Sequence, residues 1–208
     1  MASAGTVLST RMAYRAVALG LLALTLAGFA ATGIAQSNSP FVVEDARAGV
    51  RFRIDSPNSG SINSLHLQIF SDDGLLDEVR IEVDGTVDRA VAEDLDDNGL
   101  PEIYVMVQSA GSGSYGTLIG YTLNSKYGLT SIQVPELTTI AGASEGYMGH
   151  DTFTVTKGAV VRSFPVYRPG DNNAHPSGGE RRIQYRLQQN GIHWMLVPHN
   201  ISHVAHAP

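Results

Sequence analysis

From residue 65 onward, apolar and polar side chains alternate with a period of two, as they do in strands that bury one face. The alternation is clearest in eight runs, which occupy residues 65–70, 79–84, 103–107, 118–123, 153–155, 161–166, 183–187 and 192–196. Glycine and proline cluster between these runs rather than within them. Many short strands separated by regularly spaced turns predict an all-β fold, an antiparallel β-sandwich or a barrel-like single domain.

Consecutive pairs of these runs are predicted to form hairpins. The connection between 153–155 and 161–166 contains Lys157–Gly158, and the last two runs are joined by Asn190–Gly191, a strong signal for a two-residue turn. The runs at 103–107 and 118–123 flank a loop of glycine and serine, which we expect to protrude as a hairpin loop. At most one short helix is expected, around residues 136–144.

The first 35 residues have the pattern of a cleavable signal peptide. Arg11 and Arg15 precede the apolar run 16–31, and small residues at Gly33 and Ala35 form an A-x-A-like cleavage site. The alternative is a membrane anchor, but the apolar run is shorter than the ~20 residues of a spanning helix and leads into a polar stretch. We therefore expect export followed by cleavage after Ala35.

The remaining chain divides by pattern into three parts. Residues 36–48 form an N-terminal lead-in, in which a short first strand at 41–43 is compatible with the sequence. Residues 49–198 form the β domain, and 199–208 form a C-terminal tail. A domain of this length is large enough to bury a core of its own.

Charge and cysteine content narrow the partners. The chain has 14 basic and 20 acidic residues, a net charge of −6, and no cysteine. An acidic surface argues against nucleic acid and anionic membranes as partners and tolerates a cationic partner. Because there is no cysteine, lipid attachment through a cysteine after the signal is excluded as well. We expect a soluble protein that leaves the membrane after signal cleavage.

The glycine-serine loop at 109–116 contains Gly111, Gly113 and Gly116 in G-x-G-x-x-G spacing. A dinucleotide fingerprint must open a helix, whereas a strand follows here, so the helix N-terminus that would hold phosphates is missing. Other kinase motifs are absent from the sequence, and neither Ser112 nor Ser114 sits in G-x-S-x-G. The spacing therefore does not predict nucleotide binding or a hydrolase nucleophile.

The same loop has the composition of a contact site. Ser112 and Ser114 carry hydroxyls that donate and accept hydrogen bonds, and Tyr115 combines apolar area with a polar end. Small residues around one aromatic residue suit an interface anchor. The alternative is a flexible surface hairpin without a function of its own.

A second motif is an acidic turn, residues 94–102. Asp94, Asp96, Asn98 and Gly99 have the D-x-D-x-N-G spacing of calcium loops, and Glu102 follows. The bidentate glutamate expected at the twelfth position is replaced by Val105, and strands replace the flanking helices. Asp94, Asp96, Asn98 and Glu102 are thus calcium candidates, while the alternative is a turn whose side chains satisfy the local backbone.

The histidines and one long loop complete the candidates. His199, His203 and His206 have helix-like metal spacing but fall in the expected tail. His150 and Asp151 are adjacent, as in a candidate His/Asp pair, but the sequence contains no nucleophile motif whose serine they could activate. A long polar loop within 162–179 is either functional or an ordered connection. None of these patterns predicts catalysis, so we expect no enzymatic activity.

Four segments together resemble a known family, the periplasmic inhibitors of invertebrate-type (i-type) lysozyme, known as PliI. They are Asp94–Glu102, Gln108–Gly116, Gly146–Phe153 and Phe164–Asp171, and the resemblance extends over roughly residues 50–196. It implies a β-sandwich-like inhibitor from Gram-negative bacteria, and it leaves a homodimer open. In that family an S-G-x-Y loop enters the active-site cleft of the lysozyme. The resemblance therefore implies that Ser112–Gly113–Ser114–Tyr115 binds lysozyme, with Ser112 and Tyr115 as contacts and Gly113 shaping the loop.

The sequence thus predicts a periplasmic inhibitor of lysozyme with no catalytic residue and no cofactor. The acidic turn is structural in this interpretation. A secreted calcium-stabilised module that binds carbohydrate or a cell surface is the first alternative. A secreted hydrolase is the second.

Overall fold

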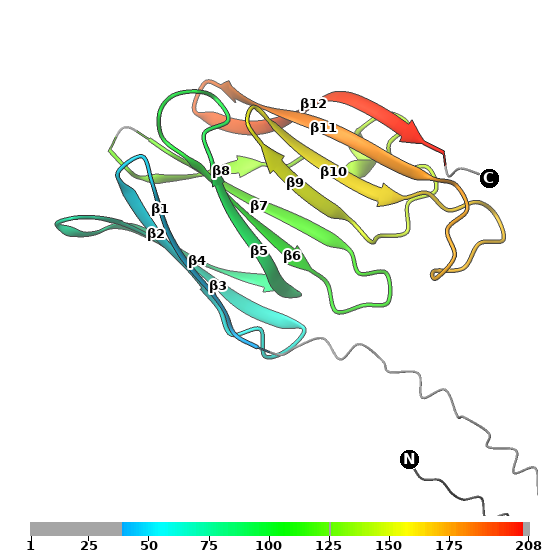
Figure 1. Cartoon of the computed structure of the whole chain (residues 1–208), viewed down its shortest axis with the longest axis horizontal. Helices are drawn as coiled ribbons and strands as arrows, with labels where there is room; N and C mark the ends of the chain where they lie inside the picture. The colour runs from blue at the N-terminus through cyan, green and yellow to red at the C-terminus, as the bar shows by residue number, and fades with distance from the viewer. Residues whose placement is uncertain (1–38, 125, 206–208) are drawn as a thin grey trace, which may run out of the picture. The chain divides into compact units, whose positions relative to one another are not determined.

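The computed structural model describes residues 39–124 and 126–205, which contain twelve strands and one turn of 3₁₀ helix (Figure 1). The first sheet has the order β1-β2-β3-β4, formed by β1 Phe41–Arg47, β2 Val50–Ser56, β3 Ile62–Ser71 and β4 Gly74–Asp84. The second has the order β5-β6-β7-β8-β12-β11-β10-β9. Its strands are β5 Thr86–Glu93, β6 Glu102–Gln108, β7 Gly116–Leu123, β8 Leu129–Gln133, β9 Thr152–Thr156, β10 Ala159–Pro165, β11 Glu180–Asn190 and β12 His193–Val204.

The all-β prediction is confirmed. All neighbouring strands pair antiparallel except β8 and β12, which pair in parallel at two positions. The short helix expected around 136–144 is reduced to the 3₁₀ turn Leu137–Thr139. No helix in the described part of the chain is long and apolar enough to cross a membrane.

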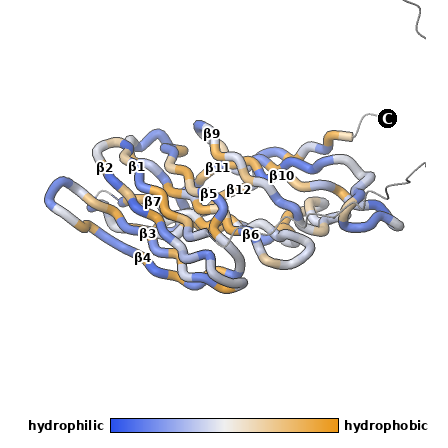
Figure 2. The backbone as a smooth tube through the Cα atoms, turned by 60° about the horizontal axis from the view of Figure 1, so that its bottom comes forward, coloured by the Kyte–Doolittle hydropathy of each residue, from blue (hydrophilic) through white to orange (hydrophobic). Residues whose placement is uncertain are grey.

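Strand β6 lies between two hydrophobic cores. Ile103, Val105 and Val107 face the first sheet, where they pack with the inward side chains of β2 and β3. Tyr104 and Met106 face the opposite way, toward the inward residues of β9–β12. The second sheet therefore folds over so that β6 is covered on both faces. Figure 2 shows hydrophobic stretches along the strands and hydrophilic stretches at several hairpin ends.

The predicted hairpins are present, with one difference in turn position. β6 pairs with β7, β9 with β10, and β11 with β12. In the last hairpin Asn190 pairs with His193, so the two loop residues are Gly191 and Ile192 rather than Asn190 and Gly191. Gly191 has φ +63°, which suits a turn with glycine at its first central position.

The domain extends further at both ends than the sequence pattern indicates. β1 pairs with β2 along its whole length, so most of the lead-in 36–48 belongs to the first sheet. β12 continues to Val204 and pairs with β11 as far as Glu180, so the tail expected at 199–208 is a strand through Val204. The pattern missed this part because residues 199–204 are exposed and are held by backbone pairing. The predicted signal peptide lies outside the described residues.

Candidate functional site

The loop between β6 and β7 projects beyond the ends of these strands (Figure 1). Its base is closed by Ser109, whose N–H donates to the Tyr115 carbonyl and whose hydroxyl accepts from the Tyr115 N–H, both at 2.9 Å. The N–H of Ser114 donates to the Gly111 carbonyl (2.9 Å). These internal hydrogen bonds close the loop into a turn.

The segment Gly146–Asp151 packs against this loop and is hydrogen-bonded to it. The N–H of His150 donates to the carbonyls of Gly113 (2.8 Å) and Ser114 (3.1 Å). Gly149 is buried at the contact and has φ +94°. A Cβ at Gly149 would lie 2.0 Å from the Gly113 carbonyl oxygen, so only glycine permits this approach.

Tyr115 lies over the same segment with 48% of its surface exposed. Its ring meets Tyr147 edge to face, with 5.7 Å between centroids, and Tyr147 meets Phe164 in the same way at 4.8 Å. A Cβ at Gly113 would lie 2.5 Å from the Tyr115 ring. The glycine of the S-G-x-Y motif therefore lets the tyrosine ring fold back against the loop.

A buried ion pair between Arg162 and Asp151 lies next to the ring of Tyr147. Arg162 Nε donates to Asp151 Oδ1 (2.6 Å), while Asp151 Oδ2 accepts from the Tyr147 hydroxyl (2.6 Å) and the Gly116 N–H (3.0 Å). Burial tends to lower the pKa of Arg162, but the Asp151 carboxylate outweighs it and the pKa is raised. Burial, together with the hydrogen bond to Asp151, raises the pKa of Tyr147. Asp151 thus joins the start of β7 to the supporting segment.

The long polar loop after β10 reaches the same place. The Tyr167 hydroxyl donates to the Asn173 carbonyl (3.0 Å), and the Asn173 side chain donates to the Ser112 carbonyl. His150 Nε2 forms a hydrogen bond with Asn173 Oδ1 (3.1 Å). The segment Gly146–Asp151 and the loop after β10 therefore both reach the tip, although they lie far from it in the sequence.

The acidic turn lies at the opposite end of β6 from the tip. Asp94 accepts hydrogen bonds from the N–H groups of Asn98 (3.1 Å) and Gly99 (2.9 Å), and the Asn98 amide donates to Asp96. Carboxylate oxygens of Asp94, Asp96 and Glu102 lie within 4.8 Å of one another. Local backbone donors satisfy much of this turn, and calcium binding stays an untested alternative to the predicted structural role.

Glu102 is the buried member of that turn, with no exposed surface. It accepts hydrogen bonds from the Leu95 N–H (2.8 Å) and the Thr122 hydroxyl (3.1 Å). Burial, reinforced by the charges of Asp96 and Asp94, raises the pKa of Glu102 to about 7. Its carboxyl group therefore changes between the protonated and the ionised form near neutral pH.

The histidine candidates do not assemble a catalytic site among the described residues. Asp151 is engaged by Arg162 and Tyr147, while the His150 ring faces Asn173. His199 and His203 lie on the exposed end of β12, on a strand rather than a helix. His206 lies outside the described residues.

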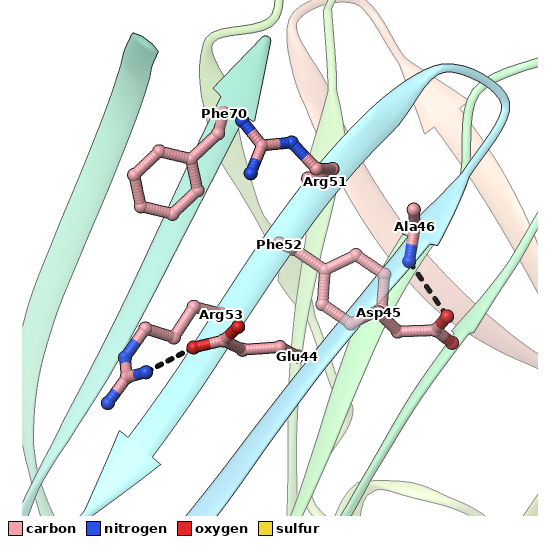
Figure 3. Close-up of a pocket in the computed structure, with 7 residues that line it drawn as sticks. All are labelled: Glu44, Asp45, Ala46, Arg51, Phe52, Arg53 and Phe70. Atoms are coloured by element: carbon pink, nitrogen blue, oxygen red, sulfur yellow. Dashed lines mark hydrogen bonds and ion pairs between the residues drawn. The ribbon is translucent and has the colours of Figure 1, made fainter. Parts of the chain in front are cut away.

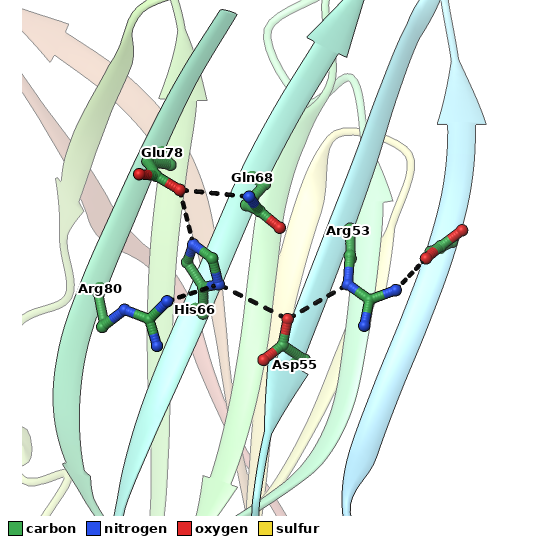
Figure 4. A network of polar contacts seen from close by, with 7 residues as sticks. Arg53, Asp55, His66, Gln68, Glu78 and Arg80 are labelled. Carbon is green, nitrogen blue, oxygen red and sulfur yellow. Dashed lines mark hydrogen bonds and ion pairs between the residues drawn. The ribbon is translucent and has the colours of Figure 1, made fainter. Parts of the chain in front are cut away.

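A polar network that was not predicted from the sequence lies on the outer face of the first sheet (Figure 4). Arg53 bridges Glu44 and Asp55, and His66 Nε2 contacts Glu78 at 2.8 Å. The hydrogen bond from His66 lowers the pKa of Glu78. A groove lies beside this network, lined by Glu44, Asp45, Ala46, Arg51, Phe52, Arg53 and Phe70 (Figure 3). Opposite charges at outward positions of adjacent strands were the available signal.

Comparison with known proteins finds similar solved structures, among them the following two. No family model matches the chain, and no curated protein does. The first structure is PliI-Ah, a periplasmic inhibitor of I-type lysozyme from Aeromonas hydrophyla, with 27% identity over 45% of this chain and 86% of that chain and a TM-score of 0.41. The second is Aeromonas hydrophila PliI in complex with Meretrix lusoria lysozyme, with 24% identity over 44% and 81% and a TM-score of 0.38. The chain is thus similar over part of its length to solved inhibitors of the family that its motifs resemble.

Proposed function

We propose that this protein inhibits lysozyme, with an i-type enzyme as its target, by inserting the tip Ser112–Tyr115 into the active-site cleft. The observation that carries the proposal is the structure of the tip. It projects from the β6–β7 hairpin, its carbonyls are hydrogen-bonded to neighbouring segments, and Tyr115 is exposed. The carbonyls of Ser112, Gly113 and Ser114 all accept hydrogen bonds from neighbouring segments. This leaves the serine and tyrosine hydroxyls available to a partner as donors.

Hydrogen-bond donors suit the chemistry of a glycosidase cleft. Such enzymes place two carboxyl groups on either side of the scissile glycosidic bond. Hydroxyl groups on a narrow loop can donate to a carboxylate without carrying charge into the cleft. Because the loop contains neither a sugar ring nor a glycosidic bond, it occupies the site without being hydrolysed.

The order within the loop favours tight binding. A loop that is already held in one conformation loses less conformational entropy when it binds. Tyr115 adds apolar area at low entropic cost, as aromatic anchors at interfaces do. The net charge of −6 also favours association with a cationic enzyme.

The proposed site of action is the periplasm. The signal-peptide pattern of residues 1–35 supports export, and peptidoglycan, the lysozyme substrate, lies in that compartment. We infer that the protein acts by binding and not by turnover. Incubation of the purified domain with peptidoglycan should therefore release no soluble fragments, whereas measurable release would favour the hydrolase alternative.

The first prediction concerns the tip. The double variant S112A/Y115A should inhibit lysozyme on the order of 100-fold more weakly, because it removes two donors and the aromatic anchor from the centre of the contact. Inhibition constants should be measured against i-type, chicken-type and goose-type lysozymes. The strongest wild-type inhibition is expected for the i-type enzyme.

A matched control removes the same atoms elsewhere. Tyr127 and Ser131 are exposed beside and within β8, and the variant S131A/Y127A should inhibit like the wild type. Full inhibition by folded S112A/Y115A would reject the tip as the site. Inhibition of no lysozyme by the wild type would reject the function.

A further inference from the structure

Three consecutive carbonyl groups of the tip accept hydrogen bonds from other parts of the chain. The Ser112 carbonyl accepts from the Asn173 side chain, the Gly113 carbonyl from the His150 N–H, and the Ser114 carbonyl from both His150 and Gln108. Such a set of hydrogen bonds fixes the orientation of each peptide plane. It also engages the three carbonyl oxygens within the molecule, so that the hydroxyl groups of the tip are the groups left to contact a partner.

Asn173 differs from the other donors in what it connects. Gln108 ends the strand that leads into the loop, and His150 donates through its backbone. Asn173 donates through its side chain to Ser112, contacts the His150 ring through Oδ1, and receives the Tyr167 hydroxyl at its own carbonyl. One half-buried side chain therefore links all three segments that meet at the tip.

We propose that Asn173 is a positioning residue for inhibition, acting through the Ser112 carbonyl to hold the tip in the conformation that binds. This inference rests on the proposed function and names a residue outside the S-G-x-Y loop. Without the Asn173 amide donor, the Ser112 peptide group is free to turn. A partner would then have to order the tip on binding, and only the fraction of molecules in the correct conformation would bind.

Two variants of Asn173 test the proposal. N173A removes both side-chain hydrogen bonds, whereas N173D keeps an oxygen toward His150 and replaces the donor to Ser112 with a carboxylate oxygen, which repels the Ser112 carbonyl. N173A should weaken inhibition roughly tenfold, the effect of about one lost hydrogen bond, and N173D at least as much. N200A, an exposed asparagine on β12, is the matched control and should inhibit like the wild type. Inhibition at the wild-type level by either folded Asn173 variant would overturn the proposal.

A positioning residue differs from a purely structural one because its effect on inhibition depends on the residues of the tip. In the S112A/Y115A background, N173A should cost little further inhibition, because the groups that it positions are gone. If the effect of N173A is the same in both backgrounds, Asn173 does not act through the tip. The melting temperatures of all variants should be compared to exclude unfolding.

A measurement on the free protein keeps this inference separate from the proposed function. Amide hydrogen exchange at Ser114 and Tyr115 should be faster in N173A and N173D than in the wild type and N200A. Unchanged exchange would overturn the positioning role even if the protein inhibits lysozyme. Faster exchange in a protein that inhibits no lysozyme would reject the proposed function and leave the contact to the tip standing.

Discussion

At the scale of residues, the chain places two carboxyl groups in opposite environments. Asp151 is buried beside Arg162, whose guanidinium neutralises it at 2.6 Å. Glu102 is buried among neutral donors with Asp94 and Asp96 nearby, and its pKa is raised to about 7. Burial of a charge is tolerated where an opposite charge is adjacent, and otherwise the group tends to take up a proton.

The raised pKa of Glu102 makes the stability of the protein depend on pH. Because its pKa is raised above the value of about 4.5 in the unfolded chain, the contribution to stability is full below about pH 4.5 and is lost as the pH rises through about 7. The loss is on the order of 3 kcal/mol. E102Q should remove this slope and be more stable than the wild type at about pH 8, as measured by urea unfolding.

Calcium binding would have the opposite effect on the stability of the wild type at about pH 8. If calcium binds the acidic turn, the wild type should gain stability at about pH 8 when calcium is added and lose it with a chelator, since the cation favours ionised Glu102. E102Q should then gain less. Melting curves that do not change with calcium or chelator would contradict the calcium hypothesis.

At the scale of elements, the contact between the tip and the segment Gly146–Asp151 depends on close approach of two backbones. Gly149 permits it because a side chain there would overlap the Gly113 carbonyl. Gly158, in the β9–β10 turn, also has a positive φ of +78° but has open space around it. The two glycines therefore separate backbone strain from displacement of the tip.

The variants G149A and G158A test this contact. G158A should lose about 1 kcal/mol of stability, the cost of a left-handed conformation for a residue with a Cβ, and G149A should lose more because its Cβ would also overlap the Gly113 carbonyl. Only G149A should also weaken inhibition strongly, because it displaces Gly113. Thermal melting and inhibition constants should be measured on the same preparations. Equal inhibition by the two variants would show that the tip does not depend on the segment below it.

At the scale of the whole molecule, we expect the acidic charge and the tip to have separate roles in the proposed inhibition. The net charge of −6 acts over distance and is screened by salt, whereas contacts at the tip act only after docking. The first should govern the rate of association with a cationic lysozyme, and the second the rate of dissociation.

Binding kinetics at several salt concentrations test this division. The association rate constant should fall as salt increases, while the dissociation rate constant changes little. S112A/Y115A should keep the salt dependence of association and dissociate faster. An association rate that is independent of salt would show that the acidic surface does not steer the encounter.

Much of the architecture follows from local patterns. Alternation in 65–70 and 79–84 predicts β3 and β4 because burying one face imposes a period of two. β6 departs from that pattern, since Glu102–Val107 is buried throughout and packs between two cores. A continuous apolar run indicates burial on both faces, but it does not say which segments cover them.

The sequence by itself determined the all-β class, the hairpin partners and the position of the glycine-serine loop, because these depend on residues close together in the chain. Tertiary structure decided what the loop rests on. Gly149, Asp151 and Asn173 contact it from positions 35 to 61 residues away, and no local periodicity reports such contacts. It also decided the ends of the domain, since β1 and the last residues of β12 are held by backbone pairing, which leaves little trace in side-chain pattern.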